Sequence, residues 1–193
     1  MQRNLILASS SAYRKQLLAR LQLPFTTQSP AIDESGKPNE PANELVQRLA
    51  HEKAKAVAIQ HNDALIIGSD QVAVLGKEIL KKPGTKANAI TQLKKCAGNT
   101  VTFHTGLCLY DSNNKQMQLA CVDYKVRFRD LSIDQIERYV DQEQPFDSAG
   151  SFKAEALGIS LFEYMQGDDP TALIGLPLIA LTSMLHNAGV ELP

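Results

Sequence analysis

The sequence is poor in the residues that build disulfide or zinc frameworks. It has no tryptophan, 6% aromatic residues and three cysteines among 193 residues. The cysteines, Cys96, Cys108 and Cys121, are odd in number and form no Cys-x-x-Cys pair. This pattern argues against a disulfide scaffold and against a structural zinc site. A reducing, cytoplasmic setting is therefore the simplest expectation.

Long apolar runs and an excess of one charge are also missing. The stretch from Leu5 to Ala8 is too short for the core of a signal peptide, and no run approaches the roughly 18 apolar residues of a membrane span. The formal net charge is −1, so no basic field concentrates nucleic acid or an anionic membrane. We expect a cytoplasmic protein with no nucleic-acid or membrane partner, whose ligand is a small anion.

Familiar nucleotide and metal signatures are absent too. The chain has no GxxxxGK[ST] loop, no GxGxxG turn and no HExxH helix. Its four histidines lack ligand-type spacing and are interpreted as surface or structural residues. Any bound metal is therefore expected to be held by oxygen.

What is present predicts an α/β protein with a mixed sheet and flanking helices. With 44% hydrophobic residues the chain can bury a core, and its length favours one domain over residues 1–193, with two interwoven lobes as an open alternative. The expected strands are 4–8, 25–28, 65–69 with a continuation over 72–75, 100–110, 119–129 and 158–162. The expected helices begin at Ser10 or Ser11 and at Pro41, and the others cover 86–97, 132–142 and 177–186.

Asp70 is the most informative single residue. It ends the run Ala64-Leu-Ile-Ile-Gly-Ser-Asp, which predicts a buried strand that delivers a carboxylate to its C-terminal edge. Open α/β sheets place their ligand crevices at that edge. A turn-forming or capping aspartate is the alternative that this pattern leaves open.

A serine-rich turn precedes the first expected helix. Ser9, Ser10 and Ser11 are followed by Tyr13 and Arg14, and arginine is unfavourable at a positive helix N-terminus unless an anion binds there. The turn thus indicates a phosphate site, with ordinary capping as the alternative. Together with Asp70, it points to metal-assisted phosphate chemistry.

Other segments are ambiguous when each is taken alone. Lys53 falls near the apolar stripe of its helix, and the basic turn Lys81 to Gly84 follows the Asp70 strand. Residues 148–155 combine a glycine turn, an aromatic ring, a lysine and a glutamate, which is typical of a ligand-closing loop but also of a plain turn into strand 158–162. Asp168 and Asp169 are interpreted as a turn and helix entry.

The ordered set of these segments resembles the Maf family of nucleotide pyrophosphatases. The matching motifs are LILASSSAYR (5–14), IDES (32–35), LAHEKA (49–54), IIGSDQV (66–72), KKPG (81–84), SAGSFK (148–153) and GLPL (175–178). The resemblance spans almost the whole chain. It implies the fold of the inosine triphosphate pyrophosphatases, an elongated mixed sheet with helices around a central cleft, and it implies a homodimer.

The resemblance also implies roles for individual residues. Asp70 corresponds to the catalytic acid, a proton acceptor, and with Glu34 it is a candidate ligand for Mg²⁺ or Mn²⁺. The candidate phosphate-binding residues are Ser9, Arg14, Lys53, Lys82 and Lys153. The implied reaction cleaves a non-standard or surplus nucleoside triphosphate to the monophosphate and pyrophosphate with a divalent cation.

Three positions separate the branches of this family. Here they are Tyr13, Gln71 and Glu155, which resemble the 7-methyl-GTP pyrophosphatase branch and depart from the dTTP/UTP branch. The aromatic face of Tyr13 suits a cationic 7-methylguanine base, and Glu155 adds an acceptor for the guanine N–H edge, while Gln71 offers a donor or an acceptor. Sister specificities remain one alternative. A non-catalytic, nucleotide-sensing regulator of septum formation is the other.

Overall fold

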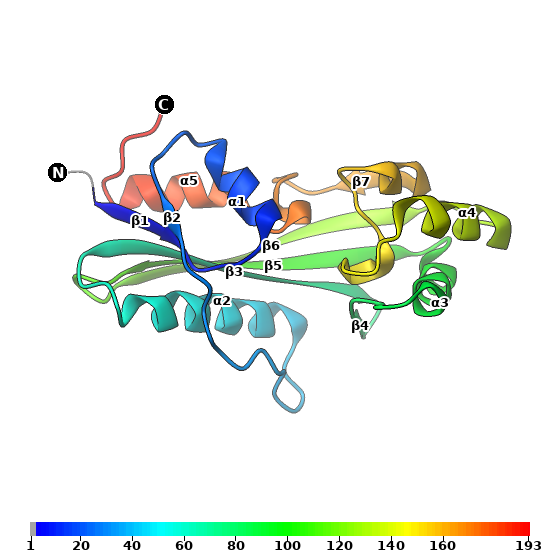
Figure 1. Cartoon of the computed structure of the whole chain (residues 1–193), viewed down its shortest axis with the longest axis horizontal. Helices are drawn as coiled ribbons and strands as arrows, with labels where there is room; N and C mark the ends of the chain where they lie inside the picture. Colours follow the sequence, from blue (N-terminus) through cyan, green and yellow to red (C-terminus); the bar gives the residue numbers. More distant parts are fainter. Residues whose placement is uncertain (1–2) are drawn as a thin grey trace. The chain divides into compact units, whose positions relative to one another are not determined.

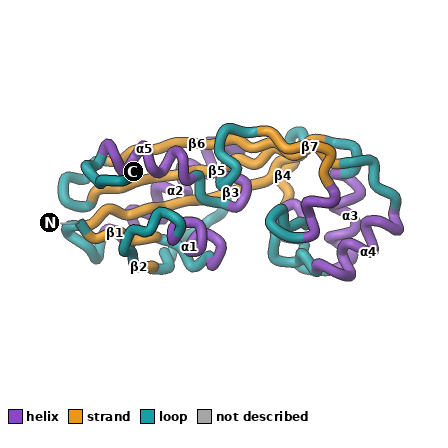
Figure 2. Tube along the Cα trace, turned by 90° about the horizontal axis from the view of Figure 1, so that it is seen from above, coloured by secondary structure: helices purple, strands orange, loops and turns teal. Residues whose placement is uncertain are grey.

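The computed structural model describes residues 3–193 and contains strands and helices in mixed order (Figures 1 and 2). The strands are β1 (Asn4–Leu7), β2 (Thr26–Thr27), β3 (Ala64–Leu75), β4 (Glu78–Leu80), β5 (Thr100–Asp111), β6 (Met117–Phe128) and β7 (Phe162–Gln166). The α-helices are α1 (Ala12–Ala19), α2 (Ala42–Ala58), α3 (Lys86–Cys96), α4 (Ile133–Glu143) and α5 (Leu178–Asn187). Short 3₁₀ turns cover Ala149–Ser151, Leu157–Leu161 and Ala172–Ile174.

The strands form a mixed sheet in the order β2-β1-β3-β5-β6-β7, with β4 also paired to β3. β1 is parallel to β2 and to β3, whereas β3 with β4 and β6 with β7 are antiparallel. β5 and β6 are neighbours joined by a short turn, and such a connection allows only an antiparallel pair. The α/β class and the mixed sheet with flanking helices predicted from the sequence are confirmed.

The chain divides into two compact units that alternate along the sequence. Unit 1 comprises residues 1–71, 105–122 and 169–193, and unit 2 comprises residues 72–104 and 123–168. Of the four boundaries, the one between Asp168 and Asp169 follows β7, and the other three fall inside β3, β5 and β6. Each of these strands therefore contributes residues to both units.

Unit 1 has three layers, because its strands alternate between two apolar faces. Leu5, Leu7 and Ile67 belong to a core cluster with residues of α1 and α5, whereas Ile6 and Ile66 belong to a second cluster with residues of α2. Successive strand residues point to opposite faces of a sheet. Accordingly, Figure 1 shows α1 and α5 on one face and α2 on the other.

Helix α2 lies directly against the sheet at two glycines. A Cβ atom on Gly68 would lie 2.0 Å from the carbonyl oxygen of Ala50, and one on Gly106 would lie 2.1 Å from that of Val46. The absence of a side chain at both positions lets the backbone of α2 approach β3 and β5. This close approach fixes the height of α2 above the strand that carries Asp70.

Unit 2 packs around an aromatic cluster. Phe128, Phe152 and Phe162 meet edge to face, with ring centroids 4.9–5.4 Å apart. Helix α4 begins at Ser132 with the predicted capping box, in which the Ser132 side chain and Gln135 satisfy each other's backbone N–H groups.

Two sequence-based expectations differ from the structure, one in each unit. The expected continuation over residues 72–75 is confirmed, because β3 runs to Leu75 and Ala73 to Leu75 pair with β4, so Asp70 lies inside the strand and not at its end. Residues 158–162 are not a strand: Leu157–Leu161 form a 3₁₀ turn, and β7 starts at Phe162. A Cβ atom on Gly158 would meet the Lys153 carbonyl oxygen at 2.4 Å, so the glycine permits this tight turn where an extended segment was expected.

The serine turn before α1 agrees with expectation. Ser11 is the N-cap residue of α1, and its side chain accepts a hydrogen bond from the Arg14 backbone N–H.

No helix within residues 3–193 combines the length and the apolar character needed to cross a lipid bilayer.

Candidate active site

A buried lysine joins two carboxylates in unit 1. Lys53 on α2 donates hydrogen bonds from Nζ to Oδ1 of Asp70 at 2.7 Å and to Oε2 of Glu34 at 2.9 Å. Asp70 is 7% exposed and Lys53 is 5% exposed, whereas Glu34 lies on an exposed loop. One end of this group of charges is thus buried against α2 and the other is open to solvent.

The place of Asp70 follows from the pairing of β1 with β3. The parallel ladder ends where Leu7 pairs with Ile67, and the chain then turns through Ser9 into α1. Asp70 comes three residues after Ile67 and shares the strand face of Ile66 and Gly68, which α2 covers. Although β3 continues, Asp70 therefore lies just past the C-terminal end of β1, where a parallel sheet opens.

The serine turn holds Arg14 in an ordered position. Ser9 is buried, and its Oγ accepts a hydrogen bond from the Ser11 backbone N–H at 3.1 Å. Arg14 Nε donates to the carbonyl oxygen of Gly175 at 2.8 Å. Burial lowers the pKa of Arg14 from its ordinary value, and the negative charges of Asp70 and Glu34 offset part of that shift. The guanidinium thus lies within electrostatic reach of both carboxylates.

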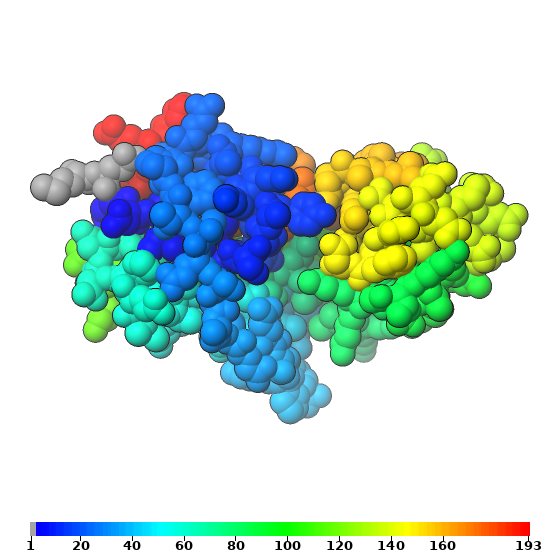
Figure 3. Space-filling view, viewed as in Figure 1, coloured from blue at the N-terminus to red at the C-terminus, as the bar shows by residue number. Residues whose placement is uncertain are grey.

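The loop that carries Glu34 is anchored to α2 by an arginine. Arg48 binds Glu40 through two hydrogen bonds, at 2.6 and 2.8 Å, and donates a third to the carbonyl oxygen of Ser35. The Arg48 hydrogen bonds lower the pKa of Glu40 to about 2. Residues of this loop form part of the surface of unit 1 in Figure 3, in mid-blue. The anchor therefore holds an otherwise exposed loop beside Lys53.

Ser69 and Gln71 point to the face of β3 opposite to Asp70. The Ser69 hydroxyl lies within hydrogen-bond distance of the carbonyl oxygens of Gly106 and Gly175. Gln71 Nε2 donates to Thr105 Oγ1 at 2.9 Å and to the carbonyl oxygens of Ala172 and Leu173 at 2.6 and 3.2 Å. Asp70, the candidate catalytic acid, and Gln71, the adjacent candidate selectivity residue, therefore contact different groups of residues on opposite faces of β3.

The segment over residues 172–175 is fixed at both ends. Asp169, which is buried, accepts hydrogen bonds from the backbone N–H groups of Thr171 and Ile179. The interpretation of Asp169 as a turn and helix-entry residue is thus confirmed. At the other end Gly175 has φ of +114°, a conformation that favours glycine.

Tyr13 presents an accessible ring on the first turn of α1. Its side chain belongs to the exposed large hydrophobic residues, at 38% exposure. An aromatic face left open beside the serine turn is available to stack on a base. This accessibility is compatible with the predicted role, which stays a prediction.

The remaining predicted residues belong to unit 2. Lys82 is exposed in the turn before α3, and Glu155 is exposed after the 3₁₀ turn at 149–151. Lys153 Nζ lies 3.6 Å from Oε1 of Glu143, and its backbone N–H donates to the Tyr139 hydroxyl. The roles of Lys82, Lys153 and Glu155 toward a nucleotide remain predictions from the family resemblance.

The carboxylates of Asp70 and Glu34 suit a hard divalent cation. Both converge on Lys53 Nζ, so a positive charge is already stabilised where they meet. Carboxylate oxygens are the ligands that Mg²⁺ and Mn²⁺ prefer. The residues present therefore fit such an ion, and its binding remains a prediction from the family resemblance.

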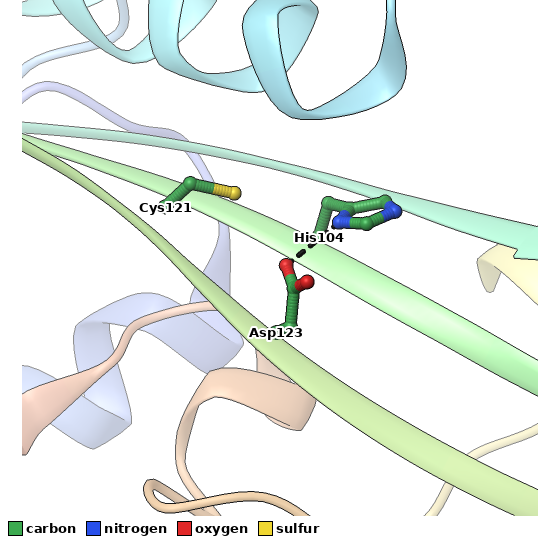
Figure 4. Close-up of side chains that lie close together, drawn as sticks. All are labelled: His104, Cys121 and Asp123. Carbon is green, nitrogen blue, oxygen red and sulfur yellow. Dashed lines mark hydrogen bonds and ion pairs between the residues drawn. The ribbon is translucent and has the colours of Figure 1, made fainter.

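One histidine is paired with an aspartate, and two of the cysteines are buried. His104 on β5 and Asp123 on β6 are joined by a hydrogen bond of 2.7 Å, which Figure 4 shows together with Cys121, two residues before Asp123 on the same strand. Burial raises the pKa of the Cys96 and Cys108 thiols to about 12. Buried thiols of this kind are poor nucleophiles.

Sequence reasoning missed Thr105, Ser69 and the carbonyl groups of residues 172–175. A lone threonine within an alternating strand gives no signal of its own. The GLPL motif marked the neighbourhood of Gly175, but nothing in the sequence indicated that its carbonyl group accepts from Arg14.

The fold and this site define an α/β protein with a buried lysine–aspartate ion pair and a serine-rich turn before α1. The chain belongs to the Maf family, since the profile described as "Maf-like protein" matches residues 4–188. The family resemblance inferred from the sequence motifs is thus confirmed.

Three relatives cover nearly the whole chain, and each is named 7-methyl-GTP pyrophosphatase. The protein from Pseudomonas putida is 58% identical over 98% of each chain. The protein from Aromatoleum aromaticum is 56% identical over 98% of this chain and 97% of its own. The protein from Pseudomonas syringae pv. syringae is 55% identical over 98% of this chain and 99% of its own.

A solved structure shares the fold at low identity. The Ham1 protein of Staphylococcus aureus superimposes with a TM-score of 0.55 and 15% identity, over 96% of this chain and 99% of that chain. This likeness supports the assigned fold.

Proposed function

We propose that this chain is a nucleotide pyrophosphatase that hydrolyses 7-methyl-GTP to 7-methyl-GMP and pyrophosphate. The observation that carries the proposal is the identity of 55–58%, over nearly full length, to relatives named for this activity. The contacts of Asp70 supply a chemical basis, because a buried carboxylate beside a lysine and an anion-type turn suits the hydrolysis of a phosphoric anhydride.

Asp70 is the proposed catalytic residue. It accepts a proton from the water that attacks the α-phosphorus, or it holds the metal ion. The new bond joins the water oxygen to the α-phosphorus, and the bond from that phosphorus to the bridging oxygen breaks, so that pyrophosphate leaves. Lys53 keeps the carboxylate in place through its 2.7 Å hydrogen bond.

Cationic and hydroxyl groups neutralise the triphosphate. The proposed phosphate-binding residues are Ser9, Arg14, Lys53, Lys82 and Lys153. Positive charge placed where negative charge develops lowers the barrier to phosphoryl transfer. Arg14 is oriented for such a role by its hydrogen bond to Gly175.

Asp70 and Glu34 are the proposed ligands of a Mg²⁺ or Mn²⁺ ion. Such an ion, when bound, polarises the phosphate and helps to neutralise its charge. For these carboxylates to bind it, the Lys53 ammonium must share or yield its two contacts.

Tyr13, Gln71 and Glu155 are the proposed selectivity residues. Tyr13 offers an aromatic face to a cationic 7-methylguanine ring, and Glu155 offers an acceptor to its N–H edge. The amide nitrogen of Gln71 is already bonded to Thr105, Ala172 and Leu173, so its oxygen is the group that remains for a ligand.

The Asp70→Asn variant tests the catalytic assignment. We expect turnover of 7-methyl-GTP to fall by about 100-fold to 10,000-fold, the usual contribution of a positioned acid or base. Circular dichroism should show the fold retained. The matched control is Asp63→Asn, which changes an exposed carboxylate in the same unit. Pyrophosphate release at the wild-type rate in Asp70→Asn would reject the assignment.

A panel of triphosphates tests the substrate. We expect kcat/KM to be highest for 7-methyl-GTP among 7-methyl-GTP, GTP, dTTP, UTP and other modified nucleotides. A higher value for dTTP or UTP would assign a sister specificity. Tight nucleotide binding without turnover in Mg²⁺ or Mn²⁺ would favour a sensing role in septum formation.

The same proposal includes the setting and the assembly of the protein. We place it in the cytoplasm as a homodimer that acts on a small-molecule nucleotide and has no nucleic-acid or membrane partner. Light scattering of the purified protein measures the assembly, and a monomeric mass at micromolar concentration would contradict it.

A further inference from the structure

Two backbone carbonyl groups favour one orientation of the Gln71 amide. Nε2 faces two backbone carbonyl oxygens, those of Ala172 and Leu173, which accept hydrogen bonds but cannot donate them. If the amide were turned by 180°, Oε1 of Gln71 would face both carbonyl oxygens, and no hydrogen bond could form between these acceptors. The side-chain nitrogen of Gln71 is therefore directed into the protein.

Thr105 completes these surroundings from β5. Its side chain is fully buried, and its hydroxyl donates to the carbonyl oxygen of Ala172 at 2.9 Å. A hydroxyl group has one proton, so toward Gln71 Nε2, 2.9 Å away, Thr105 Oγ1 can only accept. The Ala172 contact thus makes Thr105 a third acceptor for the same nitrogen.

The amide oxygen of Gln71 is left open. It has no hydrogen-bond partner within residues 3–193, and among those residues no buried side-chain nitrogen or oxygen lacks a partner. Since Gln71 is half-buried, its unbonded Oε1 must be accessible to solvent. Gln71 therefore offers a ligand an acceptor and no donor.

We propose that Thr105 is a positioning residue for nucleobase selectivity, which acts by fixing the Gln71 amide so that only its oxygen faces the ligand. This inference rests on the proposed function, in which Gln71 contributes to selectivity. A fixed acceptor favours a base edge that presents N–H donors, as guanine does through its ring N–H and exocyclic amino group. It disfavours an edge that presents a carbonyl oxygen at the same point.

The test measures the ratio of kcat/KM for 7-methyl-GTP to that for dTTP. We expect Thr105→Val, which keeps the shape but removes the hydroxyl, to lower this ratio by about 10-fold, the scale of one misdirected hydrogen bond. Thr105→Ser keeps the hydroxyl acceptor and should show the wild-type ratio. Thr102→Val makes the same change at a half-buried position of β5 and should leave it unaltered.

A double-mutant cycle separates positioning from packing. If Thr105 acts through Gln71, then Thr105→Val has no further effect on the ratio in a Gln71→Ala background. Equal losses for every substrate, with a lower melting temperature, would reduce Thr105 to a structural residue and overturn the proposal. An unchanged ratio in Thr105→Val would also overturn it.

A failure of the Thr105 role and a failure of the proposed function give different results. If the wild-type protein prefers another triphosphate, the proposed substrate fails, but the effect of Thr105→Val on the preference profile still tests the positioning role. If the protein binds nucleotides without turnover, the ratio of dissociation constants for 7-methyl-GTP and dTTP replaces the kinetic ratio. An unaltered binding ratio in Thr105→Val then overturns the inference.

Discussion

Lys53 forms ion pairs with two carboxylates, those of Glu34 and Asp70. It lies 17 residues before Asp70 and 19 residues after Glu34. Its side chain and that of Asp70 are 6% and 10% exposed, so water supplies little of their stabilisation. In such a setting the loss of one partner leaves a buried charge without compensation.

We expect Lys53→Met to lower the free energy of unfolding by about 3 kcal/mol, the scale for breaking a buried ion pair. The double variant Lys53→Met/Asp70→Asn should recover part of the loss, because the unpaired carboxylate is gone. Urea denaturation measures both. Lys55→Met changes an exposed lysine of α2 and serves as the control. A loss in Lys53→Met no larger than in this control would contradict the expectation.

Asp111 makes the stability of unit 1 depend on pH. Arg3 binds its carboxylate through two nitrogens, at 2.5 and 2.6 Å, and these hydrogen bonds lower the pKa of Asp111. Folding therefore favours the ionised form. The stabilisation is fully present above the unfolded value of about 3.9 and is lost as the pH falls through the lowered folded pKa.

We expect Asp111→Asn to cost about 1 kcal/mol at pH 7, since the pair is only partly buried. The difference from the wild type should shrink as the pH falls below the unfolded value of about 3.9, because protonated Asp111 then resembles asparagine. Urea titrations at pH 7 and at pH 3 compare the two proteins. A difference that is constant across this range would show that the charge is not responsible.

At the scale of elements, the contact of α2 with β3 decides where Lys53 lies. The contact depends on Gly68, because a methyl group there would lie 2.0 Å from the carbonyl oxygen of Ala50. Backbone atoms cannot move aside as the end of a flexible side chain can. A larger residue at position 68 must therefore displace helix α2 as a whole.

We expect Gly68→Ala to lower the free energy of unfolding by about 3 kcal/mol, as overpacking does. It should also reduce turnover, because α2 carries Lys53 away from Asp70. Gly36→Ala is the matched control, since a Cβ atom there has only the Leu45 side chain nearby, at 4.0 Å. Equal stability of the two variants would show that α2 is free to shift.

Element prediction from the sequence succeeded where local signals agree with packing. The capping box at Ser132, the Ser11 cap and the alternation in β5 and β6 were all predicted, because these features depend on residues close in sequence. The prediction failed at residues 158–162, whose apolar pattern suggested a strand. There Gly158 lies against the backbone of Lys153, and this contact favours the 3₁₀ turn.

At the scale of the whole molecule, the two units share their backbone. The chain passes from one unit to the other inside β3, β5 and β6, so neither unit is a continuous piece of sequence. We expect strands that contribute to both units to couple the unfolding of those units.

We expect a single cooperative thermal transition in calorimetry, with equal calorimetric and van't Hoff enthalpies. The Gly68→Ala variant, whose change lies in unit 1, should lower the temperature of that one transition without splitting it. Two separate transitions, with only one moved by Gly68→Ala, would contradict the coupling.

The sequence by itself determined the family, the α/β class, most element boundaries and the candidate residues, because motifs, periodicity and capping are read from neighbouring positions. The tertiary structure alone decided how those residues meet. It set Asp70 inside a strand against Lys53 and Glu34, and it turned Gln71 to the opposite face, toward Ala172, which lies 101 residues away. Such contacts arise when layers pack, and side chains on different elements leave no mark in one another's sequence.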